Sequence, residues 1–590
     1  MAAVEKLVTD HLDLWTAAIK RKSAAGRGSS SRVELYGIKK LRTLILDLAV
    51  RGMLLPQDPR DEPASELLKK IAAEKAKRVK EGEIKADKPL PAIEDVEKPF
   101  KLPSGWLWER LPNISFFQEG PGIMAKDFRS AGVPLIRISG MHGTLVSLNG
   151  CNFLDREMVA KKWNHFCLEE GDILLSSSAS LGKVSKVGND AVGGVAYTGL
   201  IRFKPYKPLF DDYLIRFFGS NEFVRQIDDS KKGAAIMHFG PTHLRWMIVP
   251  LPPLAEQHRI VAKVNELMTL CDQLEQQTDA SLSAHQTLVK TLLNALTSAA
   301  DHAQFASAWQ RIVEHFDTLF TSEESTDQLK QTILQLAVMG KLVPQDPNDE
   351  PARELLEKIA SETAKLVKEG KIKKEKPLTP ITEEEKPFEL PTGWDWARFD
   401  GLIDPEYQIS YGVLVPGPDV ENGIPFVRIE DLSLKNPPEQ PNKKISVEID
   451  RQYARTRLFG GEILMGVVGS VGKLGIAPES WRGANIARAV CRIVPTKFLH
   501  REYVVQILQS NFMQNSFIGD TRTLAQPTLN IGFIRNTLTP VPPRAEQHRI
   551  ATKVGELMAL CDQLKSRLND AQTTRLHLAD AMAEKAIARV

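Results

Sequence analysis

The sequence is poor in the features that mark several common classes of protein. Its five cysteines lie far apart and form no CxxC pair, so neither a disulfide framework nor a zinc site is predicted, and buried thiols are expected. No run of roughly 18 apolar residues occurs, the length that a membrane-spanning helix needs. Acidic residues interrupt the opening stretch MAAVEKLVTDHLDLW where a signal peptide requires an apolar core. We therefore expect a cytoplasmic protein that has no membrane segment and holds no metal.

The sequence also has almost no excess of charge of one sign. Lys and Arg number 77 against 74 Asp and Glu, a formal net charge of +3, so net charge neither requires nor excludes a nucleic-acid partner. Apolar residues at 42% and charged residues at 26% are typical of a globular chain in water. At 590 residues the chain is long enough for several domains.

The chain contains an internal repeat, which decides the architecture. The segment that begins at Leu48 with LAVRGMLLPQDPRDEPASELL returns at Leu336 as LAVMGKLVPQDPNDEPARELL, and both copies continue to a GWxW pair. A second segment, PPLAEQHRIVAKVNELM from Pro252, returns as PPRAEQHRIATKVGELM from Pro542. The repeats are displaced by 288 and 290 residues, so the material between them keeps its length to within two residues. The chain therefore uses one unit twice.

The material between the repeats keeps a common frame around different sequences. GDILLSSSASLGK from Gly171 faces GEILMGVVGSVGK from Gly461, and short apolar runs bounded by Gly, Pro and Asn predict strands in both blocks. We predict a multidomain, mixed α/β fold in which long helical, antiparallel coiled-coil-like segments separate two mixed α/β domains, with pseudo-two-fold symmetry from the internal duplication. The predicted parts are an N-terminal helical region and linker (1–105), a first α/β domain (106–250), a central helical region and linker (251–393), a second α/β domain (394–540) and a C-terminal helical region (541–590).

Both AEQHRI segments carry the apolar spacing of a helix that packs along another helix. Ile260, Val264 and Leu267 begin a stripe with alternating steps of four and three residues. The matching stripe of the second copy begins with Ile550, Val554 and Leu557. Paired prolines precede each stripe and suit a helix start. One unbroken helix over residues 252–299 would span ~70 Å at 1.5 Å per residue, roughly two turns of DNA at ~34 Å each. A helix of this length can set a fixed distance between the parts at its two ends.

Several fragments imitate catalytic motifs without meeting their requirements. GVVGSVGK, from Gly466, has Val467 where a phosphate-binding loop needs its first glycine, so a turn after a strand is the better interpretation. NPPE, from Asn436, has Glu439 where an adenine methyltransferase needs an aromatic residue to stack on the flipped base. No catalytic residue is predicted, and the chain is not expected to be an enzyme.

Other repeated residues suit structural roles. His258 and His548 lie in matching AEQHRI contexts, and no second ligand accompanies either, which favours hydrogen-bonded residues at helix starts over metal ligands. The QDP-x-DEPA segments are interpreted as helix caps and turns, with Glu62 and Glu350 in an acidic first turn. The tryptophans of the GWxW pairs are expected to pack at the start of each α/β domain rather than to stack on bases. They are Trp106, Trp108, Trp394 and Trp396.

Contacts to DNA, if the α/β blocks make them, belong in loops where basic and polar side chains reach phosphates and base edges. Residues 109–245 carry seventeen basic and fourteen acidic residues, so the first block is only weakly basic. The loop after GDILL and GEILM stands out because its strand and its final GK match while the residues between them differ. The candidate DNA-binding residues are Lys126, Arg129, Ser178, Lys183, Lys186, Lys231 and Lys232 in the first block, and Lys473, Arg482, Arg522 and Gln526 in the second.

The chain closely resembles, over its whole length, the specificity subunit of type I restriction-modification systems, and in particular the longer members of that family. The resemblance rests on the two variable blocks, the G[DE]IL…GK pattern and the PLPPLAEQHRI and PVPPRAEQHRI junctions. The resemblance implies a non-catalytic subunit in which each block reads one half of a split, asymmetric target in double-stranded DNA and the helices set the unread spacer. It implies two methylation subunits docked on the helical regions, with the stripe residues Ile260, Val264, Leu267, Ile550, Val554 and Leu557 as candidate contacts. It also implies two motor-nuclease subunits for cleavage. No cofactor is expected in this chain, and S-adenosylmethionine, ATP and Mg²⁺ are implied for the partner subunits.

Two other classes of function stay open from the sequence. A self-contained modification enzyme would need a cofactor pocket, against which the nonaromatic Glu439 argues. A helical adaptor without sequence-specific DNA binding would explain the apolar stripes but not the paired, divergent α/β blocks.

Overall fold

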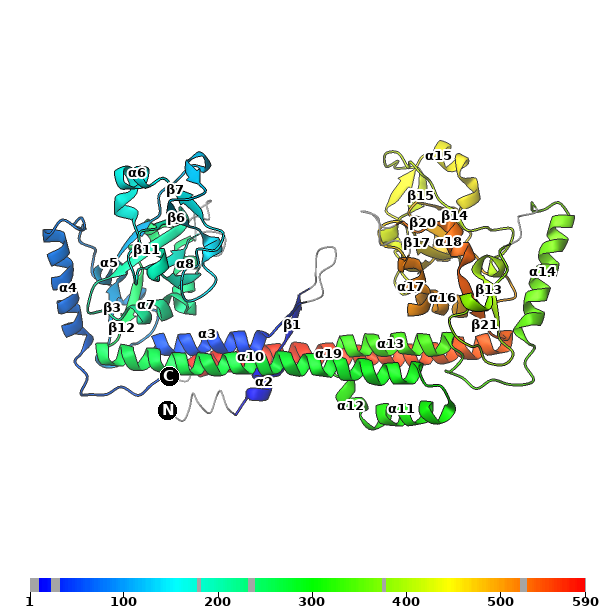
Figure 1. Cartoon of the computed structure of the whole chain (residues 1–590), viewed down its shortest axis with the longest axis horizontal. Coiled ribbons are helices and arrows are strands. Elements are labelled where there is room, and N and C mark those ends of the chain that lie inside the picture. Colours follow the sequence, from blue (N-terminus) through cyan, green and yellow to red (C-terminus); the bar gives the residue numbers. More distant parts are fainter. Residues whose placement is uncertain are drawn as a thin grey trace. The chain divides into compact units, whose positions relative to one another are not determined.

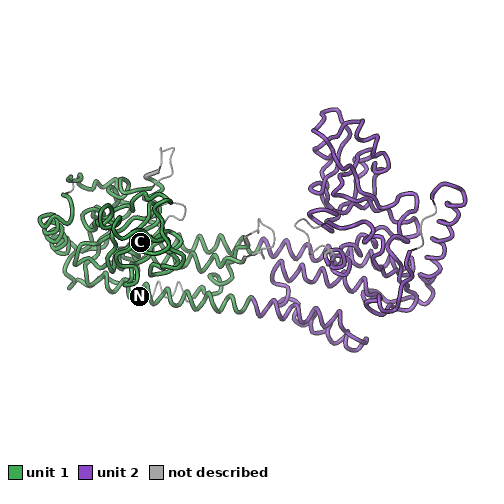
Figure 2. The backbone as a smooth tube through the Cα atoms, turned by 45° about the horizontal axis from the view of Figure 1, so that its top comes forward, with its two compact units in different colours: residues 1–282, 571–590 green, residues 283–570 purple. Residues whose placement is uncertain are grey.

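A computed structural model describes residues 10–22, 32–86, 88–177, 182–231, 239–373, 378–519 and 528–588. The chain divides into two compact units, residues 1–282 with 571–590, and residues 283–570 (Figure 2). Each unit carries one mixed α/β domain on a layer of long helices (Figure 1). The predicted fold class, two α/β domains of a duplicated chain with long helical segments, is confirmed.

Three helices form the base of unit 1. They are α3 (Tyr36–Val50), the first part of α10 (Leu254–Thr297) and the last part of α19 (Arg544–Ala588). Their apolar stripes share one core, in which Ile260 and Val264 of α10 lie with Leu41 of α3 and Ala579 of α19. Helix α10 is the unbroken helix expected over residues 252–299, and it begins directly after the paired prolines. Before α3 come α2 (Leu12–Ala17) and the antiparallel strands β1 (Lys20–Lys22) and β2 (Arg32–Glu34).

The α/β domain of unit 1 contains three small sheets. Strands β3 (Leu107–Arg110) and β12 (Ile248–Leu251) pair where the chain enters and leaves the domain, next to α10 (Figure 1). The central sheet has the order β4 (Ser115–Glu119), β11 (Leu200–Pro205), β8 (Ile173–Ser176) and β9 (Val184–Lys186). The third, on the side away from α10 in Figure 1, has the order β10 (Val195–Ala196), β6 (Val133–Ile136), β7 (Asn152–Leu154) and β5 (Phe128–Arg129). Helices α4 (Ala64–Lys80), α5 (Leu111–Ile114), α6 (Arg156–Met158), α7 (Asp211–Phe218), α8 (Asn221–Lys231) and α9 (Pro241–Leu244) complete the unit.

Unit 2 repeats this plan. Its base is formed by the last part of α10, the first part of α19, α11 (His302–Glu314), α12 (Phe316–Leu319) and α13 (Glu323–Val338). Its sheets are β13 (Asp395–Arg398) with β21 (Leu538–Val541); β14 (Ser410–Tyr411), β20 (Val490–Ile493), β17 (Ile463–Gly466) and β18 (Leu474–Ile476); and β16 (Lys443–Ile445), β15 (Ile424–Val427) and β19 (Asn485–Ile486). Its further helices are α14 (Ala352–Lys368), α15 (Val447–Gln452), α16 (Arg501–Gln509), α17 (Asn511–Gly519) and α18 (Ile531–Asn536).

The central strands are buried along their whole length, which explains their sequences. Strands β8 and β17 have every residue buried, and a strand covered on both faces reads as a continuous apolar run rather than as an alternation. The GDILL and GEILM runs are these strands.

One local prediction is wrong. Glu62 and Glu350 do not lie in the first turns of α4 and α14, because these helices begin after the prolines at positions 63 and 351. A proline has no N–H to continue a helix toward its N-terminus and is tolerated at the start. The acidic residues of the first turns are Glu66 and Glu354, each the third residue of its helix.

None of the helices in the described part of the chain has the length and apolarity needed to span a lipid bilayer.

Candidate nucleic-acid interface

The loop of the GEILM…GK pattern is a hairpin. Strands β17 and β18 pair antiparallel, and Gly469 and Gly472 between them have φ of 82° and 80°, the left-handed region that favours glycine. These glycines serve the turn, as predicted. In unit 1 the corresponding strands β8 and β9 pair in the same way, and residues 178–181 of their loop lie outside the described residues. The two domains therefore share this strand pairing, and the sequences between the paired strands differ.

The acidic residue of G[DE]IL anchors this hairpin from inside the domain. In unit 1, Asp172 is 2% exposed and its Oδ2 lies 2.6 Å from Nε of Arg202, on the neighbouring strand β11. The same oxygen accepts a hydrogen bond from the backbone N–H of Glu169 at 2.7 Å. Burial raises the pKa of Asp172, and the charge of Arg202 opposes this rise. The pair links the start of β8 to the neighbouring strand β11.

Unit 2 has a variant of the same anchor. The longer side chain of Glu462, 1% exposed, accepts the backbone N–H of Phe459 at 2.6 Å. Arg492, on β20, donates instead to the carbonyl oxygens of Arg457 at 2.7 Å and Arg455 at 2.8 Å. Burial lowers the pKa of Arg492, and the charge of Glu462 raises it. The corresponding buried guanidinium groups of the two domains therefore have different partners.

Four candidate DNA-binding residues of unit 1 lie on or beside strands of two different sheets. Lys126, just before β5, and Arg129, in β5, are exposed, and Arg129 Nη1 donates to the carbonyl oxygens of Lys126 and Phe128, both at 3.0 Å. Lys183 is exposed beside β9, whereas Lys186 in β9 is half-buried with its Nζ 3.3 Å from Asp212. Ser178 and Lys232 lie outside the described residues, as does the side chain of Lys231 at the end of α8.

Two of the four candidates of unit 2 are described. Lys473 Nζ donates to the carbonyl oxygens of Ile429 at 2.8 Å and Glu430 at 3.3 Å, so this lysine ties the hairpin to the neighbouring turn. Arg482 is exposed and its Nη2 lies 2.7 Å from Oε2 of Glu479. Arg522 and Gln526 lie outside the described residues.

A pair of exposed apolar residues escaped the sequence analysis. Met124 is 66% exposed and follows the buried Ile123, while Leu414 is 53% exposed and follows the buried Val413. The two positions are separated by the repeat displacement of 290 residues. An apolar side chain at such a place can contact the methyl group of thymine in the major groove. Only a structure separates them from their buried neighbours, because all four residues are apolar.

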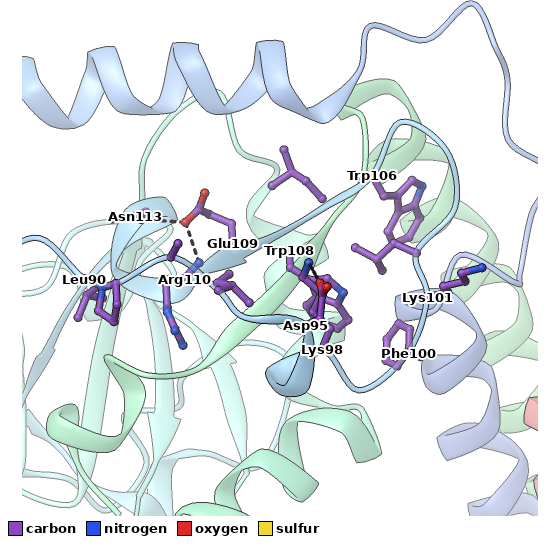
Figure 3. Close-up of a pocket in the computed structure, with 15 residues that line it drawn as sticks. Leu90, Asp95, Lys98, Phe100, Lys101, Trp106, Trp108, Glu109, Arg110 and Asn113 are labelled. Carbon is purple, nitrogen blue, oxygen red and sulfur yellow. Dashed lines mark hydrogen bonds and ion pairs between the residues drawn. The ribbon is translucent and has the colours of Figure 1, made fainter.

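An open groove of about 930 Å³ lies between the linker and β3 of unit 1 (Figure 3). Glu109 in the groove accepts hydrogen bonds from the side chain of Asn113 and the backbone N–H of Arg110, both at 2.8 Å. The Arg110 guanidinium binds Glu97 of the linker at 2.6 Å. These interactions hold the linker against the domain.

Comparison with known proteins decides the family. The family described as "Type I restriction modification DNA specificity domain" matches residues 106–284 and 418–571. The type I restriction enzyme EcoAI specificity subunit of Escherichia coli is 41% identical over 99% of this chain and 100% of its own length, and the EcoEI specificity subunit of Escherichia coli is 39% identical over the same shares.

The chain belongs to the type I restriction-modification specificity subunits. The superposition on the crystal structure of the HsdS subunit from Thermoanaerobacter tengcongensis covers 83% of this chain and 98% of that one, with 19% sequence identity and a TM-score of 0.39. A structure of a type I restriction-modification system, from work on its complex assembly and conformational transition, gives 19% identity and a TM-score of 0.48 over 83% of this chain and 99% of that one. The role expected from the sequence, a specificity subunit rather than a catalytic one, is that of the curated relatives.

The stripe residues predicted to bind a partner subunit are inside this specificity subunit. Ile260, Val264 and Leu267 are at most 2% exposed in the helical core of unit 1. Ile550 and Val554 are at most 1% exposed in unit 2, with Leu557 partly buried beside them. Periodicity predicts that a helix face is buried, but not which element covers it. These side chains pack the subunit's own helices together.

The tryptophans of the repeats pack within the subunit, whereas His258 and His548 are exposed at the start of their helices. Trp106 and Trp394 are each 8% exposed, which confirms their predicted packing at the domain start. The rings of His258 and Phe210 are tilted by 32° with centroids 4.0 Å apart, and His548 Nδ1 lies 3.2 Å from Nε2 of His500. Within the described ranges no group of three potential metal ligands occurs.

Proposed function

We propose that this subunit recognises a split, asymmetric sequence in double-stranded DNA, with each α/β domain reading one half. The observation that carries the proposal is the pair of matched hairpins, β8 with β9 and β17 with β18, which keep one frame around different loop residues. Two similar domains with unlike exposed side chains would read two unlike half-sites. The long helices α10 and α19 would then set the unread spacer between the halves.

Phosphate contacts are assigned to the exposed cations of the two domains. Lys126, Arg129 and Lys183 in unit 1 are exposed and lie on or beside strands. Arg482 in unit 2 is exposed and follows the turn of residues 479–481. Met124 and Leu414 supply matching apolar contacts to base edges. Few cations are needed if partner subunits add phosphate contacts, so we expect weak, salt-sensitive binding by the chain alone.

The proposed partners are two methylation subunits and two motor-nuclease subunits. Membership of the specificity-subunit family supports this assembly. S-adenosylmethionine would be bound by the methylation subunits, and ATP and Mg²⁺ by the motor-nuclease subunits, with no cofactor in this chain. The complex would act in the cytoplasm, where the cell's DNA lies.

The proposal is tested by mapping methylated adenines across the host genome at single-base resolution, with and without this gene. We expect one split motif to lose methylation on both strands when the gene is deleted. An unchanged map, with the partner subunits shown to be expressed, would favour a helical adaptor without sequence-specific DNA binding. Exchanging residues 106–250 with the corresponding block of a related subunit should change one half of the motif and leave the other half unchanged.

A further inference from the structure

Three repeated motifs that no DNA contact explains meet at one point in unit 1. Glu256, in the first turn of α10, is 1% exposed. Its Oε2 accepts a hydrogen bond from Nε1 of Trp106 at 2.9 Å, and its Oε1 accepts one from Nε2 of Gln57 at 3.3 Å. The carboxylate therefore joins the AEQHRI segment, the GWxW pair and the QDP segment, which lie up to 199 residues apart.

A second ring of interactions surrounds this carboxylate. Arg259 binds Asp61 through both Nη atoms, at 3.1 and 2.5 Å. Gln257 Oε1 accepts the backbone N–H of Phe210, at the start of α7, at 3.1 Å. Both rings connect the first two turns of α10 to the α/β domain and its linker.

The same network recurs in unit 2 with the same partners. Glu546, also 1% exposed, accepts from Trp394 at 3.0 Å and from Gln345 at 3.1 Å. Arg549 binds Asp349 at 3.3 and 2.6 Å, and Gln547 accepts the backbone N–H of His500 at 2.9 Å. We call each network, Gln57–Asp61–Trp106–Glu256–Arg259 and Gln345–Asp349–Trp394–Glu546–Arg549, a domain junction.

The junctions are closely packed as well as hydrogen-bonded. Gly52 and Gly340 have φ of 69° and 67°, and a Cβ on either would lie within 2.5 Å of a proline ring atom and within 3.2 Å of the junction tryptophan. Burial raises the pKa of Glu256 and of Glu546, and the hydrogen bonds from tryptophan and glutamine oppose the rise. A buried carboxylate with two fixed donors and close-packed neighbours allows the domain few orientations on its helix.

Orientation at the junction controls where the far side of the domain lies. In Figure 1, strands β3 and β12 lie next to α10, and β6 and β7 lie on the opposite side of the domain. A compact domain of about 145 residues has a radius of gyration of ~15 Å and therefore a diameter of ~40 Å, so this far side is ~40 Å from the junction. A tilt of roughly 5° moves a surface at that distance by ~3.4 Å, one base-pair step.

We propose that Glu256 and Glu546 are positioning residues that fix the tilt of each recognition domain on its long helix, and thereby restrict the subunit to one spacer length. This inference rests on the proposed function. It assigns a role in specificity to residues that read no base.

The test uses the full chain in complex with its methylation subunits and duplexes that carry the mapped target. The duplexes have the native spacer or a spacer one base pair longer or shorter, and the single-turnover methylation rate is measured on each. For Glu256→Gln, which removes one of the two acceptors, we expect the preference for the native spacer to fall about five-fold or more, because small displacements of a fixed geometry cost large factors in rate. Base preference within each half-site should stay within about two-fold of the wild type, because the reading loops are unchanged.

Matched variants separate positioning from a general loss of stability. Glu266→Gln changes a 60% exposed glutamate on the same helix and should leave the spacer preference unchanged. Glu546→Gln should act like Glu256→Gln, and Asp61→Asn, which weakens the outer ring, should act in the same direction if Glu256→Gln does not fold.

The inference is overturned if folded Glu256→Gln, Glu546→Gln and Asp61→Asn all keep the wild-type spacer preference, or if Glu266→Gln loses it equally. If the wild-type complex methylates no split target at any spacer length, the proposed function fails and this inference fails with it. A wild-type complex that methylates the native target, together with unchanged variants, would overturn this inference alone.

Discussion

Replacing Asp172 by alanine should destabilise the first recognition domain strongly and locally. The change removes the carboxylate that lies 2.6 Å from Arg202 and leaves a guanidinium that is 6% exposed without its closest counter-charge. Breaking a buried ion pair by removing one partner costs about 3–5 kcal/mol. Glu169, 3.3 Å from Arg202 but 59% exposed, compensates only in part, so we expect a cost near the lower end of this range.

Hydrogen exchange measured by mass spectrometry reports this cost for each domain separately, which a single melting curve of a multidomain chain does not. Peptides that cover β11 should exchange roughly 10²–10³-fold faster in Asp172→Ala, since each 1.36 kcal/mol is a factor of ten. The matched variant Glu462→Ala should cost only about 1–3 kcal/mol in β20, because Arg492 keeps two carbonyl partners. A change below about 1 kcal/mol in β11, or an equal effect in β20, would refute the argument.

The pH dependence follows from the same burial. Burial raises the pKa of Asp172 in the folded domain, so the folded state binds this proton at a pH where the unfolded chain has released it. The contribution of this carboxyl to stability is greatest below its unfolded pKa and declines as the pH rises through its folded pKa. The difference in stability between the wild type and Asp172→Ala should therefore grow as the pH is lowered from 7 toward 4, and a difference that shrinks would contradict the assignment.

Three further predictions concern other parts of the subunit. Lys126→Ala should reduce the slope of log K against log salt concentration for DNA binding by about 1, and an unchanged slope would remove Lys126 from the phosphate contacts. Burial raises the pKa of Cys491 to about 12. A thiol reagent at pH 8 should therefore leave this cysteine unmodified in the folded chain and label it after denaturation, as read by peptide mass spectrometry. Labelling of the folded chain would show that β20 opens. His500→Phe introduces the Phe210 arrangement of unit 1 into unit 2. It should change the free energy of opening by less than about 1 kcal/mol, measured by hydrogen exchange of peptides that cover α16. A larger loss would show that the contact between His500 and His548 stabilises unit 2.

Much of the architecture could be predicted because it depends on periodic patterns. The stripe that begins at Ile260 predicted α10, and the repeat predicted that unit 2 copies unit 1. The glycines of GVVGSVGK were predicted to form a turn because the fragment fails the requirements of a phosphate loop, and the β17–β18 hairpin confirms it. Local rules also misled, since Glu62 precedes rather than enters α4.

The DNA-binding candidates show where sequence reasoning stops. Lys126 and Lys186 carry the same charge, yet Lys126 is exposed whereas Lys186 is half-buried beside Asp212. Met124 and Ile123 are both apolar, yet only Met124 is exposed. Exposure depends on the neighbouring strands, which a linear pattern does not specify.

By itself, the sequence determined that the chain is duplicated, with two variable domains and long helices, because repeats and apolar periods are linear properties. Its motifs resembled those of the specificity subunits, and the comparisons confirmed that family. Only the tertiary structure decided which groups complete one another. It paired Trp106 with Glu256 across 150 residues and Asp172 with Arg202 across neighbouring strands, and it turned the stripe of Ile260 toward the subunit's own core. A buried polar group must find a partner in space, and chain separation sets no limit on where that partner comes from.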